Sequence, residues 1–380
     1  MKSMLTGKVI LIISPDSWSH VFISKHNYSV EAAQKGNLVY FLSPIENKLK
    51  KGEVTIEDSG FENLFVVRYQ PWFPIFLRFQ LPQLFHWLMN RQAKKIVKVI
   101  GKPIDIVWDF NPLPLFNDLR IFRAPISIFH PVDKILNKVD NRGANIVFSL
   151  SQEIFDMVQS DKAPKVFINH GLSKSYVKEL SGNGISSSME KRVKICYVGN
   201  LMIHSIDFEL MQQIIEENSV VDFHFIGPYE NAGNPLGMSS NNQSDLFVAF
   251  LKKQAHVTLY GAMKSSEVAR KLKEFDGFIL CYKQSKYFSN DNSHKILEYL
   301  STGKVIISTH ITHYRNEDFL VMSPKENNKA FANLFREVVT NISTYNSKEL
   351  ADKRIAYALD NTYEKQMERI EGSLLTIATH

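Results

Sequence analysis

The residues best suited to chemistry lie between positions 290 and 309, where a polar loop opens a short predicted helix. Ser293 suits the N-cap of that helix, and the backbone amides of His294 and Lys295 would then face an anion at its first turn. Lys295 adds a full positive charge, and Glu298 follows one turn later on nearly the same face. A nucleoside diphosphate needs a cation near its pyrophosphate and a carboxylate that accepts hydrogen bonds from its ribose hydroxyls, and this helix offers both. A capped surface helix with a salt bridge between Lys295 and Glu298 explains the spacing equally well.

Strand ends in the same half of the chain carry residues that could approach a phosphate group. Predicted strands over 194–200, 256–262 and 277–282 end in or next to glycine or polar residues. Ligands of open parallel sheets bind beyond the carboxyl ends of the strands, and a glycine there lets backbone amides reach the ligand. For any single glycine, a tight strand-to-helix turn is the simpler explanation. The candidate residues at these ends are Gly199, Asn200, Tyr260, Gly261, Met263, Lys264 and Tyr282.

The sequence argues against several other kinds of site. It contains neither G-x-G-x-x-G nor G-x-x-x-x-G-K-[ST], which speaks against a dinucleotide-binding dehydrogenase and a P-loop NTPase. No His, Cys or Asp cluster has the spacing of a zinc site. Cys196 and Cys281 each lie in an apolar strand-like run and look like small core residues of a reducing compartment. We therefore expect neither a bound metal nor a disulfide.

The apolar pattern predicts that these residues are carried by an α/β scaffold. Short runs that are apolar on successive residues alternate with helical stretches, as in parallel sheets covered on both faces. The predicted helices are 20–35, 151–159, 208–217, 265–275 and 293–301. The predicted strands are 9–14, 38–43, 64–69, 104–110, 126–130, 145–151, 165–171, 194–200, 221–227, 256–262, 277–282 and 304–309.

A polar stretch rich in Gly and Ser, residues 178–193, separates the two series of strands and is predicted to be a linker. We therefore assign residues 1–177 to an N-terminal domain and residues 194–347 to a second domain. The last seventy residues are charged and predicted to be mostly helical, and residues 348–380 are assigned to C-terminal helices.

The run from Asn290 to Thr309 resembles the donor-binding helix of GT-B glycosyltransferases, whose common form is a Pro/Ser-x-Lys-x-x-Glu-Tyr-x-x-x-Gly-x-Pro-Val-like sequence. The similarity is good over about residues 165–310. Within this fold the chain is most similar to the family of the membrane-associated xanthan glucuronosyltransferase and related envelope-glycan enzymes. The residues that carry this similarity are Gly199, Tyr260, Gly261, Met263, Lys264, Asp291, Ser293, Lys295, Leu297 and Tyr299.

The resemblance implies a GT-B fold, in which two Rossmann-like domains with parallel sheets face a central cleft and C-terminal helices from 348–380 pack back on the first domain. It implies that residues 260–263 hold the nucleotide base, residues 293–295 the diphosphate and Glu298 the ribose. It also implies that the nucleotide-sugar is a substrate and that no cofactor or metal is needed. Many retaining members carry a glutamate eight positions before Glu298, where this chain has Asn290, which favours an inverting reaction.

An inverting transfer needs a base that takes the proton of the acceptor hydroxyl. Asp133 follows the predicted strand 126–130 in the domain expected to bind the acceptor, and the enzymes that the chain resembles place an aspartate similarly. Each aspartate of this kind, taken alone, is more ordinarily a cap of a helix or turn. The rivals of Asp133, which also follow predicted strands, are Asp16, Asp109 and His20.

Charge and surface composition indicate the partners. The net charge of +6 favours an anionic partner, but no RNA- or DNA-binding motif is present. Residues 72–100 mix Trp, Phe and Leu with five basic residues, which suits a helix on an anionic membrane; a pair of amphipathic core helices is the alternative. No segment reaches the roughly 18–20 apolar residues of a membrane span, and the first apolar run is too short for a signal peptide. We expect a cytoplasmic protein, peripheral on the inner face of the cell membrane.

Together these observations predict a metal-independent hexosyl- or uronosyltransferase. It would move a sugar from a nucleotide-sugar, expected to be a UDP-sugar, to a glycan or lipid-linked glycan in envelope polysaccharide synthesis. The alternatives are a GT-B sugar-nucleotide epimerase and a non-catalytic nucleotide-sugar-binding module. An enzyme releases nucleoside diphosphate when given donor and acceptor, whereas a binding module does not.

Overall fold

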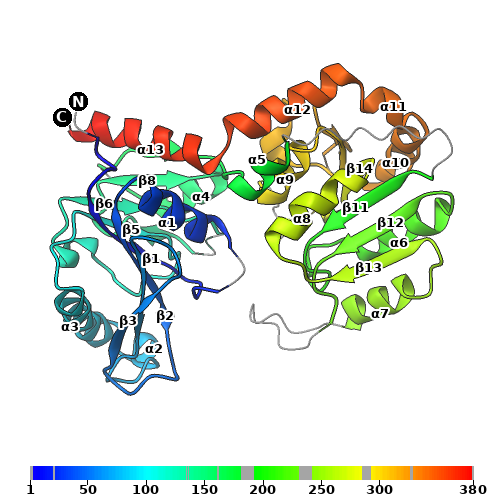
Figure 1. Cartoon of the computed structure of the whole chain (residues 1–380). Helices are drawn as coiled ribbons and strands as arrows, with labels where there is room; N and C mark the ends of the chain where they lie inside the picture. Colours follow the sequence, from blue (N-terminus) through cyan, green and yellow to red (C-terminus); the bar gives the residue numbers. More distant parts are fainter. Residues whose placement is uncertain are drawn as a thin grey trace. The chain divides into compact units, whose positions relative to one another are not determined.

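The computed structural model describes residues 3–19, 22–133, 135, 137–160, 162–180, 192–230, 242–284, 292–325 and 328–378. Our expectations for His20, Asn290 and Asp291 fall outside these residues. The chain divides into two compact units, Met1–Gly171 with Tyr363–His380 and Leu172–Thr362 (Figure 1). Each unit is built around its own sheet.

An eight-stranded sheet forms the centre of the first unit, in the order β10-β8-β6-β5-β1-β2-β4-β3. Its neighbouring strands are parallel, except that β3 is antiparallel to β4. The central strand β1 reads VILII, a continuous apolar run, because both faces of the sheet are covered. The strands are β1 (Val9–Ile13), β2 (Leu38–Ile45), β3 (Val54–Asp58), β4 (Leu64–Tyr69), β5 (Ile106–Asp109), β6 (Ile126–Phe129), β8 (Ile146–Ser149) and β10 (Lys165–Phe167), and β7 (Val139–Asp140) pairs with β9 (Val158–Gln159).

Helices cover both faces of this sheet. On one face, Tyr28 of α1 and Tyr363 of α13 pack in one apolar cluster with Trp108 of β5; α13 lies beside α1 in Figure 1. On the other face, Phe85 and Met89 of α3 pack in a second cluster. The helices are α1 (Ser24–Gln34), α2 (Leu77–Gln80), α3 (Pro82–Ile100), η1 (Leu119–Phe122), α4 (Gln152–Met157) and α13 (Tyr363–Ala378).

The second unit is built on a six-stranded, all-parallel sheet in the order β13-β12-β11-β14-β15-β16. One apolar core cluster, in which Cys196 and Cys281 are buried, runs through this unit. The strands are β11 (Lys194–Val198), β12 (Asp222–Ile226), β13 (Val257–Gly261), β14 (Gly277–Leu280), β15 (Val305–Ser308) and β16 (Val321–Met322). The helices are α5 (Lys174–Leu180), α6 (Phe208–Glu217), α7 (Asn242–Leu251), α8 (Ser265–Lys271), η2 (Leu272–Glu274), α9 (His294–Leu300), η3 (Thr312–Tyr314), η4 (Asn328–Ala330), α10 (Phe331–Thr340), α11 (Ile342–Tyr345) and α12 (Lys348–Asp360).

The unit boundaries correct our domain ranges at two places. Residues 172–177, which we assigned to the first domain, belong to the second unit, and so does α12. The buried Arg354 of α12 explains this placement, because its guanidinium donates to the carbonyls of Phe319 (3.0 Å), Gly303 (3.0 Å) and Tyr345 (2.8 Å). Only the chain from Tyr363 onward returns to the first unit.

Several elements were not predicted, among them β3, the short strands β7, β9 and β16, and the helices α5 and α7. None of the five residues of β3 is fully buried, and its sequence VTIED lacks the apolar run that marks the central strands. The predicted helices within 72–100 correspond to α2 and α3. In the part of the chain that the structure describes, no helix combines the length and the apolar character that crossing a membrane requires.

Candidate functional site

Three glycines meet where β11, β12 and β13 end at one edge of the six-stranded sheet. Gly199 donates its N–H to the carbonyl of Ile226 (2.8 Å), and Gly227 donates to the carbonyl of Gly261 (2.8 Å). Gly199 and Gly227 have φ values of +154° and +140°, and a Cβ on Gly227 would lie 2.1 Å from the Gly199 carbonyl oxygen. The backbone segments approach each other here as only glycine allows. Gly227 was not among our site residues, although the strand 221–227 was predicted to end in it.

Lys295 places its ammonium group beside the end of β11. A Cβ on Gly199 would lie 2.5 Å from Lys295 Nζ, so the amine occupies the space that a side chain there would need. Lys295 Nζ donates to the Tyr282 hydroxyl (3.3 Å) and lies 5.2 Å from the centre of the Tyr197 ring. No salt bridge within 4.0 Å joins Lys295 to Glu298, both of which the structure describes. The salt-bridge explanation of their spacing is therefore wrong, and Glu298 does not neutralise the ammonium charge by direct pairing.

Helix α9 is fixed to the sheet by Tyr299. Its hydroxyl accepts the N–H of Val198 (2.7 Å), and its ring stacks on Phe278 with 4.2 Å between ring centres. Ser293 occupies the predicted N-cap position in an extended conformation, but its side chain makes no capping hydrogen bond. The contact of Tyr299 with β11 thus determines where Lys295, one turn earlier, presents its charge.

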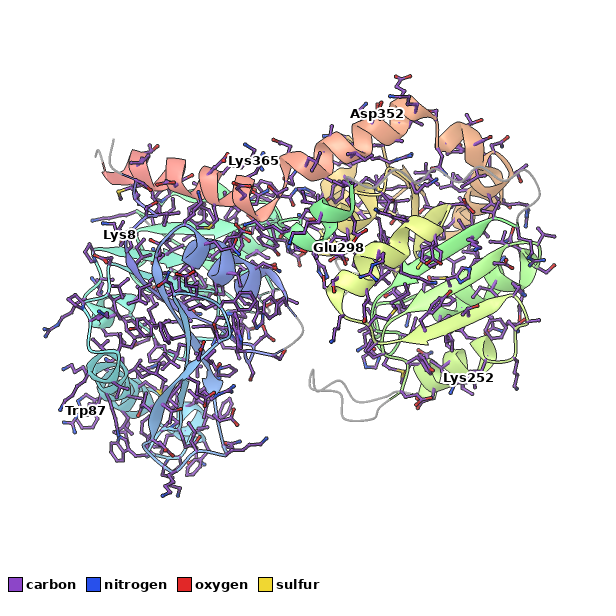
Figure 2. All side chains as sticks on the ribbon, in the orientation of Figure 1. Lys8, Trp87, Lys252, Glu298, Asp352 and Lys365 are labelled. Carbon is purple, nitrogen blue, oxygen red and sulfur yellow. The ribbon has the colours of Figure 1, made fainter. Side chains whose placement is uncertain are left out.

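Glu298, which Figure 2 labels, lies on α9, one turn after Lys295. Tyr176 of α5 lies near the Glu298 carboxyl group. Burial raises the pKa of Glu298 to about 7, while the nearby Tyr176 hydroxyl and the charge of Lys295 lower it. A carboxylate with this pKa is ionised in part at neutral pH and can then accept hydrogen bonds from hydroxyl groups. Tyr176 was not predicted, since nothing in its local sequence marks it.

Two other candidates near the strand ends have partners of their own. Asn200 Oδ1 accepts the N–H of Met202 (2.8 Å), which shapes the loop after β11. The Tyr260 hydroxyl lies 3.0 Å from His224 Nδ1, and its ring is partly buried. These contacts hold the loops in place and leave only part of each side chain accessible.

The segment between β13 and α8 stays partly open. Gly261 has φ of +74°, Met263 packs partly buried on the core, and Lys264 is exposed at the N-cap position of α8. His294 is also exposed, at the first position of α9. The structure therefore places Lys295 against both Gly199 and Tyr282, with the other candidates distributed along the loops that follow β11, β13 and β14.

The first unit has a separate polar group at the ends of β1 and β6. Lys25, on the first turn of α1, is 1% exposed, and its Nζ lies 2.5 Å from Asp16 Oδ2 and 3.0 Å from Asp133 Oδ2. The Asp133 side chain is 56% exposed and that of Asp16 is 30% exposed. The structure thus joins the predicted base and one of its rivals through a buried lysine. Sequence reasoning missed Lys25, because a helical lysine is ordinarily exposed.

Asp109, another rival of Asp133, has a structural role. It is 1% exposed and forms an ion pair with the equally buried Arg142, with 2.5 Å between Asp109 Oδ2 and Arg142 Nη1. Burial raises the pKa of Asp109, and the neighbouring Arg142 lowers it. The same guanidinium donates to the carbonyls of Asn111 (2.7 Å) and Pro112 (2.9 Å). Because the carboxylate is enclosed and paired, it cannot act on an acceptor.

No protein-family model matches the sequence, and no curated protein does. Solved structures do match. A glycosyltransferase from Rickettsia africae has 14% identity and a TM-score of 0.67, with 98% of each chain covered. Anabaena HepE, solved with UDP and glucose, has 11% identity and a TM-score of 0.63, with 97% of this chain and 99% of that chain covered. The E. coli trehalose-6-phosphate enzyme, solved with UDP-2-fluoro glucose, has 10% identity and a TM-score of 0.67, with 96% and 98% covered.

At sequence identities this low, the structural similarity establishes the fold. The chain has the two Rossmann-like α/β units of the GT-B glycosyltransferases, as the resemblance in its sequence implied. Among the described residues, no group of three or more His, Cys, Asp and Glu side chains is arranged to hold a metal ion.

Replacing Gly227 tests the close approach of the strand ends. In Gly227→Ala the new methyl group would overlap the Gly199 carbonyl, so we expect a loss of about 1–3 kcal/mol in the free energy of unfolding, measured in urea. Gly372→Ala is the control, because a Cβ there meets nothing within 4 Å and alanine stabilises a helix interior by about 0.5–1 kcal/mol. Equal stability of Gly227→Ala and the wild type would contradict the described contact.

Proposed function

We propose that the protein is a glycosyltransferase that moves a sugar from a UDP-sugar to a hydroxyl group of a glycan or lipid-linked glycan. The observation that carries the proposal is the Lys295 ammonium beside Gly199, at the carboxyl edge of the sheet. A fixed positive charge there would stabilise the charge that develops on the leaving diphosphate. Two structural neighbours were solved with UDP and glucose or with UDP-2-fluoro glucose, which supports the choice of nucleotide.

The other donor contacts follow from the same arrangement. We assign the base to residues 260–263, the diphosphate to residues 293–295 with the loop at Gly199, and the ribose to Glu298. These assignments follow the resemblance in the sequence. A role in envelope polysaccharide synthesis, with a hexosyl or uronosyl group transferred, completes the proposal.

The pair of carboxylates on Lys25 supports Asp133 as the base of an inverting reaction. Two carboxylates share one ammonium group, so the three ionised groups together keep one net negative charge. Asp133 is the more exposed of the two and lies farther from Lys25 Nζ. In the proposed step it takes the proton of the acceptor hydroxyl, the acceptor oxygen bonds to the anomeric carbon, and the bond from that carbon to the diphosphate breaks. A neighbouring trehalose-6-phosphate synthase transfers with retention, so the stereochemistry must be measured.

Removing the Lys295 charge tests the diphosphate site. Lys295→Ala should weaken UDP binding by about 10- to 100-fold and leave uridine binding nearly unchanged, because a charged hydrogen bond to a phosphate is worth about 1.5–3 kcal/mol. Isothermal titration with both ligands measures this difference. Lys348→Ala, whose side chain is 89% exposed, is the control. Equal losses for UDP and uridine would place Lys295 away from the diphosphate.

Removing the Asp133 charge tests the base. Asp133→Asn should lower turnover by about 10²–10⁴-fold with little change in UDP affinity, since general base catalysis contributes about that much. Asp16→Asn should have the smaller effect, because Asp133 would keep its charge beside Lys25. The anomeric configuration of the product, read by NMR, should be inverted. Near-normal turnover of Asp133→Asn, or retention of configuration, would count against this role.

The surface of α2 and α3 supports a peripheral position on a membrane. One side of α3 packs in the core, but the segment also exposes large apolar side chains, with Phe79 at 77% and Trp87 at 49% exposure. Figure 2 labels Trp87. Residues 72–100 contain no Asp or Glu. Exposed aromatic side chains beside basic ones suit the interface of an anionic bilayer. The exposed apolar residues are Trp72, Phe76, Phe79, Leu81, Leu84, Trp87 and Val99, and the basic ones are Arg78, Arg91, Lys94, Lys95 and Lys98.

Vesicle binding tests this surface. Replacing Lys94, Lys95 and Lys98 together with Ser should weaken binding to vesicles that contain anionic lipid by about 100-fold, since each basic residue contributes about 1 kcal/mol. Replacing both Phe79 and Trp87 with Ser should also weaken it, with less dependence on salt. If the wild-type protein did not bind anionic vesicles even at low ionic strength, the proposed membrane contact of this surface would be wrong.

A further inference from the structure

A pocket of about 430 Å³ lies at the amino edge of the six-stranded sheet, with walls from α5, α8, η2, the end of α9 and α12. Two of its lining residues, Gly303 and Lys304, directly precede β15. A third, Asn346, accepts the N–H of Val305 (2.8 Å) and donates to the carbonyl of Asp276 (2.7 Å), just before β15 and β14. We place the nucleotide at the opposite, carboxyl edge. The pocket is therefore separate from the proposed donor site.

The walls of this pocket are held together by direct contacts. The buried Arg354 of α12 donates to the carbonyl of Gly303 (3.0 Å), and a Cβ on that glycine would lie 3.1 Å from the Cβ of Ala351. Across the pocket, Lys273 of η2 pairs with Glu179 of α5, with 3.1 Å between Nζ and Oε2. The pocket is thus already formed in the free protein, and its volume is in the range of small-molecule sites, about 300–1,000 Å³.

The charged residues of the lining leave one positive charge without a partner. They are three lysines and two acids, and both acids are paired, Glu179 with Lys273 and Asp352 with Lys348 (2.6 Å). The remaining lysine, Lys304, is partly buried and has no carboxylate within 4.0 Å among the residues that the structure describes. The lining therefore keeps one net positive charge, which a ligand with one negative charge would neutralise.

Three uncharged polar side chains of the lining are bonded within the protein. The Ser301 hydroxyl donates to the backbone carbonyl of Glu298 (2.6 Å), and the Thr302 hydroxyl donates to that of Tyr299 (2.7 Å). Both amide atoms of Asn346 are used at the strand starts. A sugar or a nucleotide would find few free partners here, whereas the apolar part of a ligand can pack on the wall. The apolar residues of the lining include Leu180, Ala269, Ala351 and Ile355.

We propose that this pocket is a second ligand site, which binds a small organic carboxylate whose apolar body packs on the wall and whose carboxylate pairs with Lys304. Burial of the apolar body removes apolar surface from water, and the charged hydrogen bond to the ammonium adds to it. A phosphate monoester, with a charge of about −1.5 to −2 at neutral pH, would exceed the one unpaired lysine. The inference concerns a different edge of the sheet from the donor site and does not depend on the proposed function.

The experiment titrates the full chain at pH 7 with hexanoate and with two compounds that each lack one part of it. Hexanamide keeps the apolar body without the charge, and acetate keeps the charge without the body. We expect hexanoate to bind with a dissociation constant on the order of 1 mM. The other two should bind at least about tenfold more weakly, since a hydrogen bond to a charged group contributes about that factor. Equal binding of hexanoate and hexanamide would overturn the inference.

Two substitutions locate the ligand. Lys304→Ala should weaken hexanoate binding by about tenfold or more. Lys304→Glu should abolish it and favour hexylammonium instead, because the sign of the charge is reversed. Lys94→Ala is the matched control, since Lys94 lies on the basic and aromatic surface of α3, the other place where hexanoate could bind. It should leave the affinity unchanged.

Four results would overturn the inference: no binding of hexanoate to the wild type, unchanged binding in Lys304→Ala, loss of binding in Lys94→Ala, or complete displacement of hexanoate by UDP. The comparison of the three compounds uses only the wild type, so it decides the matter even if a variant did not fold. Failure of the protein to bind UDP would count against the proposed function alone.

Discussion

The account of the second unit depends on the absence of a side chain at Gly199. A Cβ there would lie 2.5 Å from Lys295 Nζ and 2.9 Å from the Tyr197 hydroxyl, so the glycine makes the space that the lysine fills. The Tyr299 hydroxyl is hydrogen-bonded to the backbone of β11 and fixes the position of α9 on the sheet. It thereby fixes where the Lys295 ammonium group lies. Together with the close backbone contact at Gly227, these constraints place the positive charge of Lys295 where three parallel strands end. That edge is where parallel α/β sheets bind ligands.

The first unit contains two buried basic side chains whose carboxylate partners differ in exposure. Asp109 and Arg142 are both enclosed and neutralise each other, an arrangement that fixes the loop after β5 and offers nothing to a ligand. Lys25 is equally buried, but it faces two carboxylates that remain partly exposed. A buried charge must be paired, and here the pairing leaves one carboxylate in excess at the surface. This imbalance distinguishes Asp133 and Asp16 from the other acidic residues that follow strands.

Much of the scaffold could be predicted from the sequence, because continuous apolar runs such as VILII and VIIS mark strands covered on both faces. The N-cap position of Ser293 and the helix that carries Lys295 could also be predicted from the local sequence. The edge strand β3 was not, since a half-exposed strand lacks that pattern. Lys25 was missed because its partner Asp133 lies far along the sequence. The place of α12 depends on the distant carbonyls that Arg354 binds, and no spacing reveals it.

A crystal structure of the protein grown with UDP tests the central claim most directly. The account predicts a diphosphate oxygen about 2.7–2.9 Å from Lys295 Nζ, the distance of a charged N–H···O hydrogen bond. It also predicts that the phosphates lie against the backbone at Gly199. A nucleotide bound elsewhere on the chain, or a diphosphate that leaves Lys295 in contact only with Tyr197 and Tyr282, would contradict it.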